Sequence, residues 1–245
     1  MNSYPKKNLK SGCEKTESFR CPKCKDRGLV YNPETDAMDD CECRERTLYE
    51  TILRNSGISE AFRKKTFDTF QDKGNRELQK TKIAAIMYCK EFKQIQDNVS
   101  NSIAFLGQVG AGKTHLSIAI ANNLMSENIG VLYMQYRDVI TQLKQNMLDE
   151  YYYQKEISKY KNATVLLIDD LFKGKITETD INIMFEIINY RYLKGCPMIV
   201  SSEYTSDKLL NIDEAIGSRI IEKCDGRMIE FVGGNFNHRL NKRAI

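Results

Sequence analysis

Gly107-Gln-Val-Gly-Ala-Gly112-Lys113-Thr114 is the stretch that decides the fold of this chain. It matches the pattern G-x-x-x-x-G-K-[ST], whose glycines let the backbone curl so that successive N–H groups point at a phosphate. The apolar run Ser102–Leu106 precedes it and the helical pattern Lys113–Glu127 follows it. We therefore expect a phosphate loop between a strand and a helix, with the partial positive charge of the helix N-terminus aimed at the ligand. The predicted nucleotide-binding residues are Gly107, Gln108, Val109, Gly110, Ala111, Gly112, Lys113, Thr114 and His115.

Two acidic residues end a second apolar run, Val165-Leu-Leu-Ile-Asp169-Asp170. The carboxyl ends of parallel strands meet at one edge of a sheet, so these acids should lie beside the phosphate loop. We expect Lys113 to bridge the β- and γ-phosphates, and Thr114 and Asp169 to bind Mg²⁺. Asp170 would polarise the water that attacks the γ-phosphate. This pattern predicts hydrolysis of a nucleoside triphosphate.

A third apolar run, Met198-Ile-Val-Ser201-Ser202, ends in small polar residues and is followed by Glu203. In nucleotidases with this order of elements, such a strand end carries a residue that senses the γ-phosphate. We predict Ser202 for this role.

Arg219 and Arg239 are candidates for a charge-stabilising finger and a second sensor. A guanidinium suits both roles because it is always charged and binds phosphate in bidentate fashion. Lys223 and Arg227 lie close to Arg219 in the sequence and are alternatives for the finger. A solvated surface position is the other interpretation of either arginine.

Beyond residue 100, short apolar runs alternate with longer helical patterns, which is typical of a parallel sheet with crossover helices. We predict an α/β fold with a five-stranded parallel sheet. The expected strands are Ser102–Leu106, Val131–Tyr136, Val165–Asp169, Met198–Ser202 and Arg227–Val232. The expected helices are Arg44–Asn55, Asn75–Gln96, Lys113–Glu127, Asp138–Asp149, Thr177–Leu193 and Asp213–Lys223. Residues 151–161 interleave tyrosines with lysines, which suits either single-stranded nucleic acid or an amphipathic connector.

Four of the eight cysteines lie in two close pairs, Cys21-Pro-Lys-Cys24 and Cys41-Glu-Cys43. Four thiolates can close a tetrahedral Zn²⁺ site, and the turn-forming residues between the pairs predict a loop-rich knuckle. Cys13 is a substitute candidate for one ligand. Unliganded thiols or a redox pair are the alternative.

The composition is that of a globular protein, with 41% hydrophobic and 29% charged residues and a net charge of +4. The longest apolar run, Ile83–Cys89, is far shorter than the roughly 20 residues of a membrane helix. With no secretory signal at its start, the chain is expected in a reducing cytoplasm, without a membrane partner. We expect a flexible arm (1–20) and a metal-binding head within residues 1–55, a linker over 56–75, and the nucleotide-binding domain over 76–245.

The motifs GQVGAGKTH, LLIDDL, IVSSEY, GSRIIE and GGNFNHRLNK resemble the DnaC/DnaI-type helicase loaders. These are AAA+ ATPases of bacteria and phages, grouped with the transposition helper ATPase IstB. The resemblance runs from about Ala61 to the C-terminus and implies a P-loop AAA+ core with a truncated lid. It also implies that Thr66, Phe67 and Phe70 lie near the adenine of ATP. Glu203 departs from the asparagine that many relatives carry after the sensor strand.

The resemblance implies an ATP-dependent loader of the replicative hexameric helicase that uses ATP, Mg²⁺ and Zn²⁺. Residues 1–55 would bind the helicase, basic loops would bind single-stranded DNA, and Arg219 of one copy would complete the ATP site of the next in a homo-oligomer. The alternatives are an IstB-like transposition helper, a P-loop kinase, and a head that binds nucleic acid instead of the helicase.

Overall fold

The protein is described from a computed structural model that places residues 19, 21–44, 51, 54–233 and 236–237. The chain divides into two compact units, Met1–Thr47 and Leu48–Ile245. The expected arm (residues 1–20), apart from Phe19, and much of the expected helix 44–55 lie outside the described residues.

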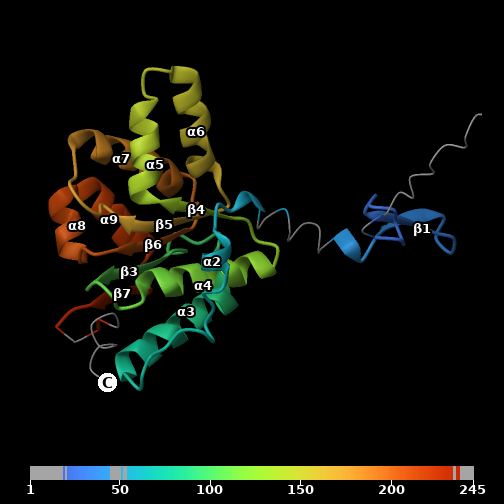
Figure 1. Cartoon of the computed structure of the whole chain (residues 1–245), viewed down its shortest axis with the longest axis horizontal. Helices are drawn as coiled ribbons and strands as arrows, with labels where there is room; N and C mark the ends of the chain where they lie inside the picture. The colour runs from blue at the N-terminus through green and yellow to red at the C-terminus, as the bar shows by residue number, and fades with distance from the viewer. Residues whose placement is uncertain (1–18, 20, 45–50, 52–53, 234–235, 238–245) are drawn as a thin grey trace, which may run out of the picture. The chain divides into compact units, whose positions relative to one another are not determined.

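Five parallel strands form the centre of the second unit (Figure 1). They are paired in the order β4-β5-β6-β3-β7, so the chain passes from β3 to the far edge strand β4 and then returns strand by strand to β6, beside β3. This reversal beside β3 is where open α/β sheets bind ligands. All five predicted strands are confirmed, and with them the α/β fold class. Their bounds are β3 (Ile103–Gly107), β4 (Val131–Gln135), β5 (Val165–Leu171), β6 (Met198–Ser202) and β7 (Met228–Phe231).

Helices cover both faces of the sheet (Figure 1). One face, here called the α4 face, carries α2 (Glu60–Arg63), α3 (Arg76–Ile95) and α4 (Lys113–Ser126). The opposite α7 face carries α5 (Tyr136–Gln145), α6 (Glu150–Asn162), α7 (Glu178–Leu193), α8 (Ser206–Ile212) and α9 (Glu214–Lys223). Successive strand residues alternate between the two faces, so Ile199 packs into the α4-side core while Met198 and Val200 pack into the α7-side core.

The predicted C-terminal end of the helix Asp138–Asp149 is wrong. Helix α5 stops at Gln145, and a separate helix, α6, begins at Glu150 because the Asp149 side chain accepts a hydrogen bond from the Tyr152 N–H. An aspartate in this position caps a new helix instead of continuing an old one. The tyrosine-rich segment, for which a connector was one interpretation, is therefore helical.

The end of α6 is held by a buried arginine. The Arg191 guanidinium is fully buried, and it donates hydrogen bonds to backbone carbonyl oxygens where α6 ends, where β5 begins and before β6. The accepting carbonyls belong to Tyr160, Lys161, Ala163, Thr164 and Pro197. Burial lowers the pKa of this guanidinium to about 10.

The expected linker, residues 56–75, is part of the second unit. Asn122 on α4 donates hydrogen bonds to the carbonyl oxygens of Arg63 and Lys65, and the Tyr133 N–H donates to that of Ser56 at 2.7 Å. Residues 56–65 are therefore fixed beside the phosphate-loop helix.

The first unit contains an antiparallel hairpin of β1 (Leu29–Asn32) and β2 (Ala37–Asp40), in which Tyr31 lies opposite Met38. Sequence analysis predicted loops here, so this is a correction. Both strands are short, and three of their eight residues are acidic or asparagine, which masks the apolar alternation of a strand. Among the helices that the structure describes, none is long and apolar enough to cross a membrane.

Candidate functional site

The phosphate loop depends on close backbone approaches at two glycines. Gly107 and Gly112 have φ values of 94° and 87°, in the left-handed region that favours glycine. A Cβ on Gly107 would lie 2.5 Å from the carbonyl oxygen of Phe231, and one on Gly112 would lie 2.6 Å from the Phe70 ring. Helix α4 begins at Lys113 without a side-chain cap. Its N-terminus is thus free of a competing side-chain acceptor where an anion would bind.

Lys113 is buried within this loop. Its Nζ donates hydrogen bonds to the carbonyl oxygens of Gly107 and Gln108, each at 2.7 Å. Burial lowers the pKa of Lys113, while the negative charges of Glu203 and Asp170 oppose that shift. The ammonium therefore lies beside the loop, with neutral hydrogen-bond partners that a phosphate could replace.

Three hydroxyl groups surround the Asp169 carboxylate at the end of β5. Thr114 Oγ1 donates to Oδ1 at 2.8 Å, Ser201 Oγ donates to Oδ1 at 2.5 Å, and Tyr133 OH donates to Oδ2 at 3.1 Å. The predicted Mg²⁺ ligands Thr114 and Asp169 are thus in direct contact. Adjacent hydroxyl and carboxylate oxygens are the hard ligands that Mg²⁺ prefers, so these residues fit the ion.

The Ser201 hydroxyl, and not that of the predicted sensor Ser202, contacts the Asp169 carboxylate. Ser202 Oγ donates to the Leu171 carbonyl oxygen at 2.8 Å and accepts from the Tyr204 N–H, so its hydrogen bonds go to backbone groups. Ser201 instead donates to Asp169 and accepts from the Asp170 N–H at 2.9 Å. The cause is strand alternation: Ser201 shares the α4 face with Ile199, whereas Ser202 faces α7. Strand alternation predicts that the two serines face opposite sides of the sheet, but not which of them faces α4.

Asp170 lies beside a lysine that sequence analysis did not single out. Lys173 Nζ contacts Asp170 Oδ2 at 2.7 Å and Glu203 Oε1 at 3.0 Å. Lys173 also takes part in the site because it lines the same pocket as the phosphate loop. The catalytic candidate Asp170 is therefore ion-paired in this state of the protein.

A pocket of about 430 Å³ joins the phosphate loop to the residues ahead of α3. This volume is within the range of small-molecule sites. Phe70 and His115 line it and contact each other edge to face, and His115 Nε2 donates to the Thr66 carbonyl oxygen at 2.8 Å. Phe67 packs against the α4-side core and is not among the lining residues. The pocket is lined by Lys65, Thr69, Phe70, Gln71, Leu78, Val109, Gly110, Ala111, Gly112, Lys113, Thr114, His115, Asp170, Lys173 and Glu203.

Arg219, one of the two predicted arginines, is not among the lining residues of this pocket. Arg219 on α9 donates to Asn189 Oδ1 and to the Ala215 carbonyl oxygen, and its guanidinium lies over the rings of Phe185 and Tyr192. It is therefore held against α7. Arg239 lies outside the described residues.

A second pocket, of about 340 Å³, is rich in basic side chains. The buried Tyr136 hydroxyl at its wall has no hydrogen-bond partner among the described residues. Lys173 lines this pocket as well as the first. An anion fits such a lining, which consists of Tyr136, Arg137, Ile140, Thr141, Lys144, Gln145, Lys173, Lys175 and Asp180.

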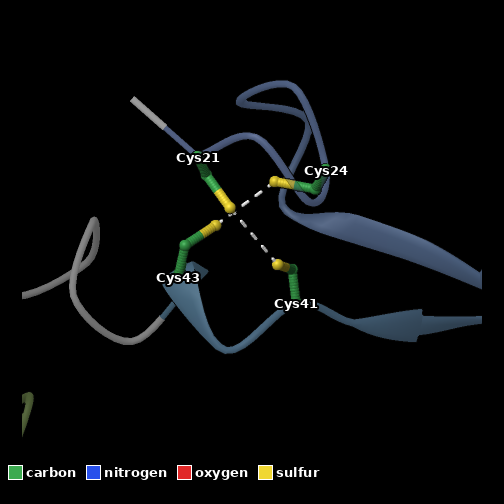
Figure 2. A group of neighbouring side chains, drawn as sticks. All are labelled: Cys21, Cys24, Cys41 and Cys43. Atoms are coloured by element: carbon green, nitrogen blue, oxygen red, sulfur yellow. Dashed lines mark hydrogen bonds between the residues drawn. The ribbon is translucent and has the colours of Figure 1, made fainter. Parts of the chain in front are cut away.

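The four predicted metal ligands of the first unit converge on one point (Figure 2). The sulfur atoms of Cys21, Cys24, Cys41 and Cys43 all lie within 4.8 Å of one another. The Sγ atoms of Cys21 and Cys41 are 3.7 Å apart, and those of Cys24 and Cys43 are 3.3 Å apart. A tetrahedral zinc site with Zn–S bonds of about 2.3 Å has S–S edges of about 3.8 Å. The cluster can therefore hold a metal ion.

Ionisation of one thiol is already favoured. Burial opposes ionisation of Cys24, but hydrogen bonds to its sulfur from Cys43 and from the Gly28 N–H outweigh it and lower the Cys24 pKa to about 7. A thiolate is the form that binds a metal.

A family model described as "IstB-like ATP binding protein" matches residues 38–228. This range includes the phosphate loop, both acids and all of β6. The chain belongs to the IstB-like ATP-binding protein family. Membership confirms the family predicted from the sequence motifs and, with it, ATP as the nucleotide.

Relatives support this placement in the IstB-like family. The phage-like element PBSX protein XkdC of Bacillus subtilis (strain 168) is 37% identical over 233 residues, which cover 91% of this chain and 86% of XkdC. A DnaC helicase loader has the same fold, with a TM-score of 0.58 and 21% identity over 70% of this chain and 98% of the loader. So has a replication initiator DnaA bound to AMPPCP and single-stranded DNA, with a TM-score of 0.55 and 21% identity over 77% of this chain and 57% of DnaA. These likenesses show that the second unit shares its fold with the DnaC loader and with DnaA.

Proposed function

We propose that this IstB-like protein is an ATP-dependent loader of the replicative DNA helicase. The observation that carries the ATP-dependent part is the contact between Thr114 and Asp169 beside the buried Lys113, because these three side chains can serve one Mg²⁺–triphosphate group. Helicase loading itself is supported by the shared fold with the DnaC loader and by the first unit, Met1–Thr47, which contains the four-cysteine cluster.

In the proposed ATPase cycle, Lys113 exchanges its two carbonyl partners for β- and γ-phosphate oxygens. Thr114 and Asp169 would hold Mg²⁺, which would supply positive charge beside the phosphates. Ser201 and Tyr133 keep the Asp169 carboxylate oriented through their hydroxyl groups. Asp170 orients the attacking water, and Phe70 and His115 contact the adenine side of the nucleotide.

Self-assembly would complete the site. Copies of the chain would lie side by side so that Arg219 or Arg239 of one copy reaches the γ-phosphate bound to the next. The position of Arg219 on α9, outside its own ATP pocket, is compatible with service to a neighbouring copy.

Single-stranded DNA is the proposed ligand of the second pocket. Its basic side chains Arg137, Lys144 and Lys175 can neutralise backbone phosphates, and the unpaired Tyr136 hydroxyl can donate to a phosphate oxygen. This assignment would connect DNA to the ATP pocket through the shared residue Lys173.

The first unit, with its four-cysteine cluster, is the proposed helicase-binding element, and Zn²⁺ is its proposed metal. Leu29, Tyr31 and Met38 lie on one face of the hairpin and are exposed, Tyr31 by 57% and Met38 by 55%. Exposed aromatic and methionine side chains on a rigid hairpin are typical of protein-binding surfaces. Zinc would stabilise a unit that is too small to depend on a core alone.

The test measures ATP turnover and loading of the purified replicative helicase onto single-stranded DNA by the full-length chain. Lys113→Ala should lower turnover by roughly 100-fold and abolish loading, because the charge on the triphosphate is left unpaired. Arg219→Ala should lower turnover only at concentrations where the chain self-assembles. Lys208→Ala on α8 removes an exposed lysine outside both pockets and serves as the control. Normal loading by both Lys113→Ala and Arg219→Ala would contradict the proposal.

An IstB-like transposition helper is the second candidate because the family takes its name from IstB. It would share the ATP site but act with a transposase on duplex DNA. Co-purification separates the two functions: retention of the replicative helicase supports loading, and retention of a transposase supports the helper.

A further inference from the structure

Lys173 lies between the two acidic strand ends of the ATP pocket. Its Nζ is 2.7 Å from Asp170 Oδ2, at the end of β5, and 3.0 Å from Glu203 Oε1, just after β6. All three side chains line the pocket that also contains Lys113 and Thr114. All three are partly exposed, Lys173 by 42% of its side chain. The ammonium is therefore accessible to a ligand in the pocket.

The backbone of residues 170–173 fixes Lys173 in this place. Asp170 and Phe172 both have left-handed φ values, 56° and 63°, and the pairing of β5 with β6 is irregular between Ile168 and Leu171. Phe172 is fully buried and packs edge to face on Tyr136, while the Lys173 N–H donates to the Asp170 carbonyl oxygen. Strained backbone of this kind persists where the surroundings over-determine it. The result is that Asp170 and Lys173 both line the pocket.

Lys173 partly neutralises the acidic side chains of the pocket. Asp169, Asp170 and Glu203 bring three carboxyl groups close to the place of the triphosphate, and Glu203 cannot itself donate a hydrogen bond to a phosphate oxygen while ionised. An unpaired carboxylate there would repel the γ-phosphate. Lys173 removes this repulsion and presents an ammonium at the same position.

We propose that Lys173 binds the terminal phosphate of ATP and that Glu203 is the positioning residue that holds it there. This inference rests on the proposed ATP site. On arrival of ATP, the ammonium exchanges one carboxylate partner, Asp170, for a γ-phosphate oxygen and keeps Glu203. Asp170 is then free to accept a hydrogen bond from the attacking water. ADP lacks the γ-phosphate, so it leaves Lys173 paired with both acids.

The first experiment measures ATP and ADP affinities of the full-length chain by calorimetry in the presence of Mg²⁺. Lys173→Gln should weaken ATP binding by roughly 10- to 100-fold, as expected for loss of a charge-assisted bond, and leave ADP affinity nearly unchanged. Lys173→Arg should retain most of the preference for ATP, which shows that the charge is required. Lys208→Gln, with the same change of charge outside both pockets, should match the wild type. An unchanged ATP-to-ADP ratio in Lys173→Gln would overturn the assignment.

The second experiment isolates the role of Glu203. Glu203→Gln should lower kcat by roughly 5- to 10-fold in the wild-type background and have little further effect in the Lys173→Gln background, because the two residues act together. A purely structural effect of Glu203 would be the same in both backgrounds, and that result would overturn its positioning role.

The outcomes also separate this inference from the proposed function. If the wild-type chain binds no ATP, or if Lys113→Ala binds it normally, both the ATP site and the role of Lys173 are wrong. If the wild type hydrolyses ATP and Lys113→Ala does not, but Lys173→Gln keeps a normal preference for ATP over ADP, the ATP site stands and Lys173 has no part in it.

Discussion

Lys113 keeps a charged group inside the protein, beside carbonyl oxygens that are neutral partners. Because burial lowers its pKa, the ammonium loses its proton at a lower pH than an ordinary lysine does. ATP binding needs the protonated form, so affinity should fall as the pH rises through this lowered pKa. ATP titrations from about pH 7 to about pH 10 should show the fall, and Lys113→Arg should remove it because a guanidinium stays charged. The same alkaline loss in Lys113→Arg would contradict this explanation.

His115 makes the folded protein sensitive to acid. Burial lowers the pKa of His115 below its usual 6.5, so the unfolded chain binds a proton first as the pH falls. The free energy of unfolding should therefore decrease on acidification through pH 6.5 and level off below the lowered pKa. Urea unfolding over this range should show the decrease for the wild type and a smaller one for His115→Gln. His238→Gln, which removes the other histidine, is the control, and an equal decrease in His115→Gln would contradict the assignment.

Site residues could be predicted where a motif fixes their spacing. They could not be predicted where the role depends on which side of the sheet a side chain faces. Lys113, Thr114 and Asp169 follow from the phosphate loop and from the end of an apolar strand, and the structure brings them together. Ser201 could not be chosen over Ser202 without the side of the sheet on which α4 packs. Lys173 could not be predicted because its position depends on the left-handed backbone conformation of Asp170 and Phe172, which no sequence motif indicates.

At the scale of elements, Arg191 joins α6 to the starts of two strands. Arg191→Met should lower the free energy of unfolding by about 3 kcal/mol or more, because it leaves several buried carbonyl oxygens without a donor. Arg191→Lys should recover part of this loss, since an ammonium has fewer donors. Urea unfolding measures both, with the exposed Arg54→Met as the control. A loss below about 1 kcal/mol would contradict the role of Arg191.

The helices and strands that could be predicted from the sequence are those whose residues form a clear apolar pattern. The three inner strands, β5, β6 and β3, are almost entirely buried and begin as apolar runs, whereas the edge strands β4 and β7 are only partly buried. The β1–β2 hairpin was missed because cysteine geometry, rather than a core, supports it. Helix α6 was ambiguous for a related reason, since Ile157 is its single buried residue.

At the scale of the whole molecule, the chain has two compact units with separate chemistry. Metal analysis should find about one Zn²⁺ per chain, and Cys41→Ser should lose it. The loss should abolish helicase capture while ATP affinity stays unchanged, because the ATP pocket is built from the second unit. Calorimetry with ATP and a helicase pull-down on the same sample measure the two effects. Cys196→Ser, outside the cluster, is the control, and a fall in ATP affinity on loss of the metal would contradict independence of the units.

The shared position of Lys173 has a thermodynamic consequence. One ammonium lines both the ATP pocket and the basic pocket, and it cannot serve a phosphate in each at full strength. Occupancy of one pocket must then change the affinity of the other, and linkage requires the change to be equal in both directions. A nucleotide that draws Lys173 toward itself would lower the affinity of the basic pocket for its ligand. That ligand would lower the affinity for the nucleotide by the same factor. If DNA occupies the basic pocket as proposed, such reciprocity would couple DNA release to nucleotide binding without any large movement of the sheet.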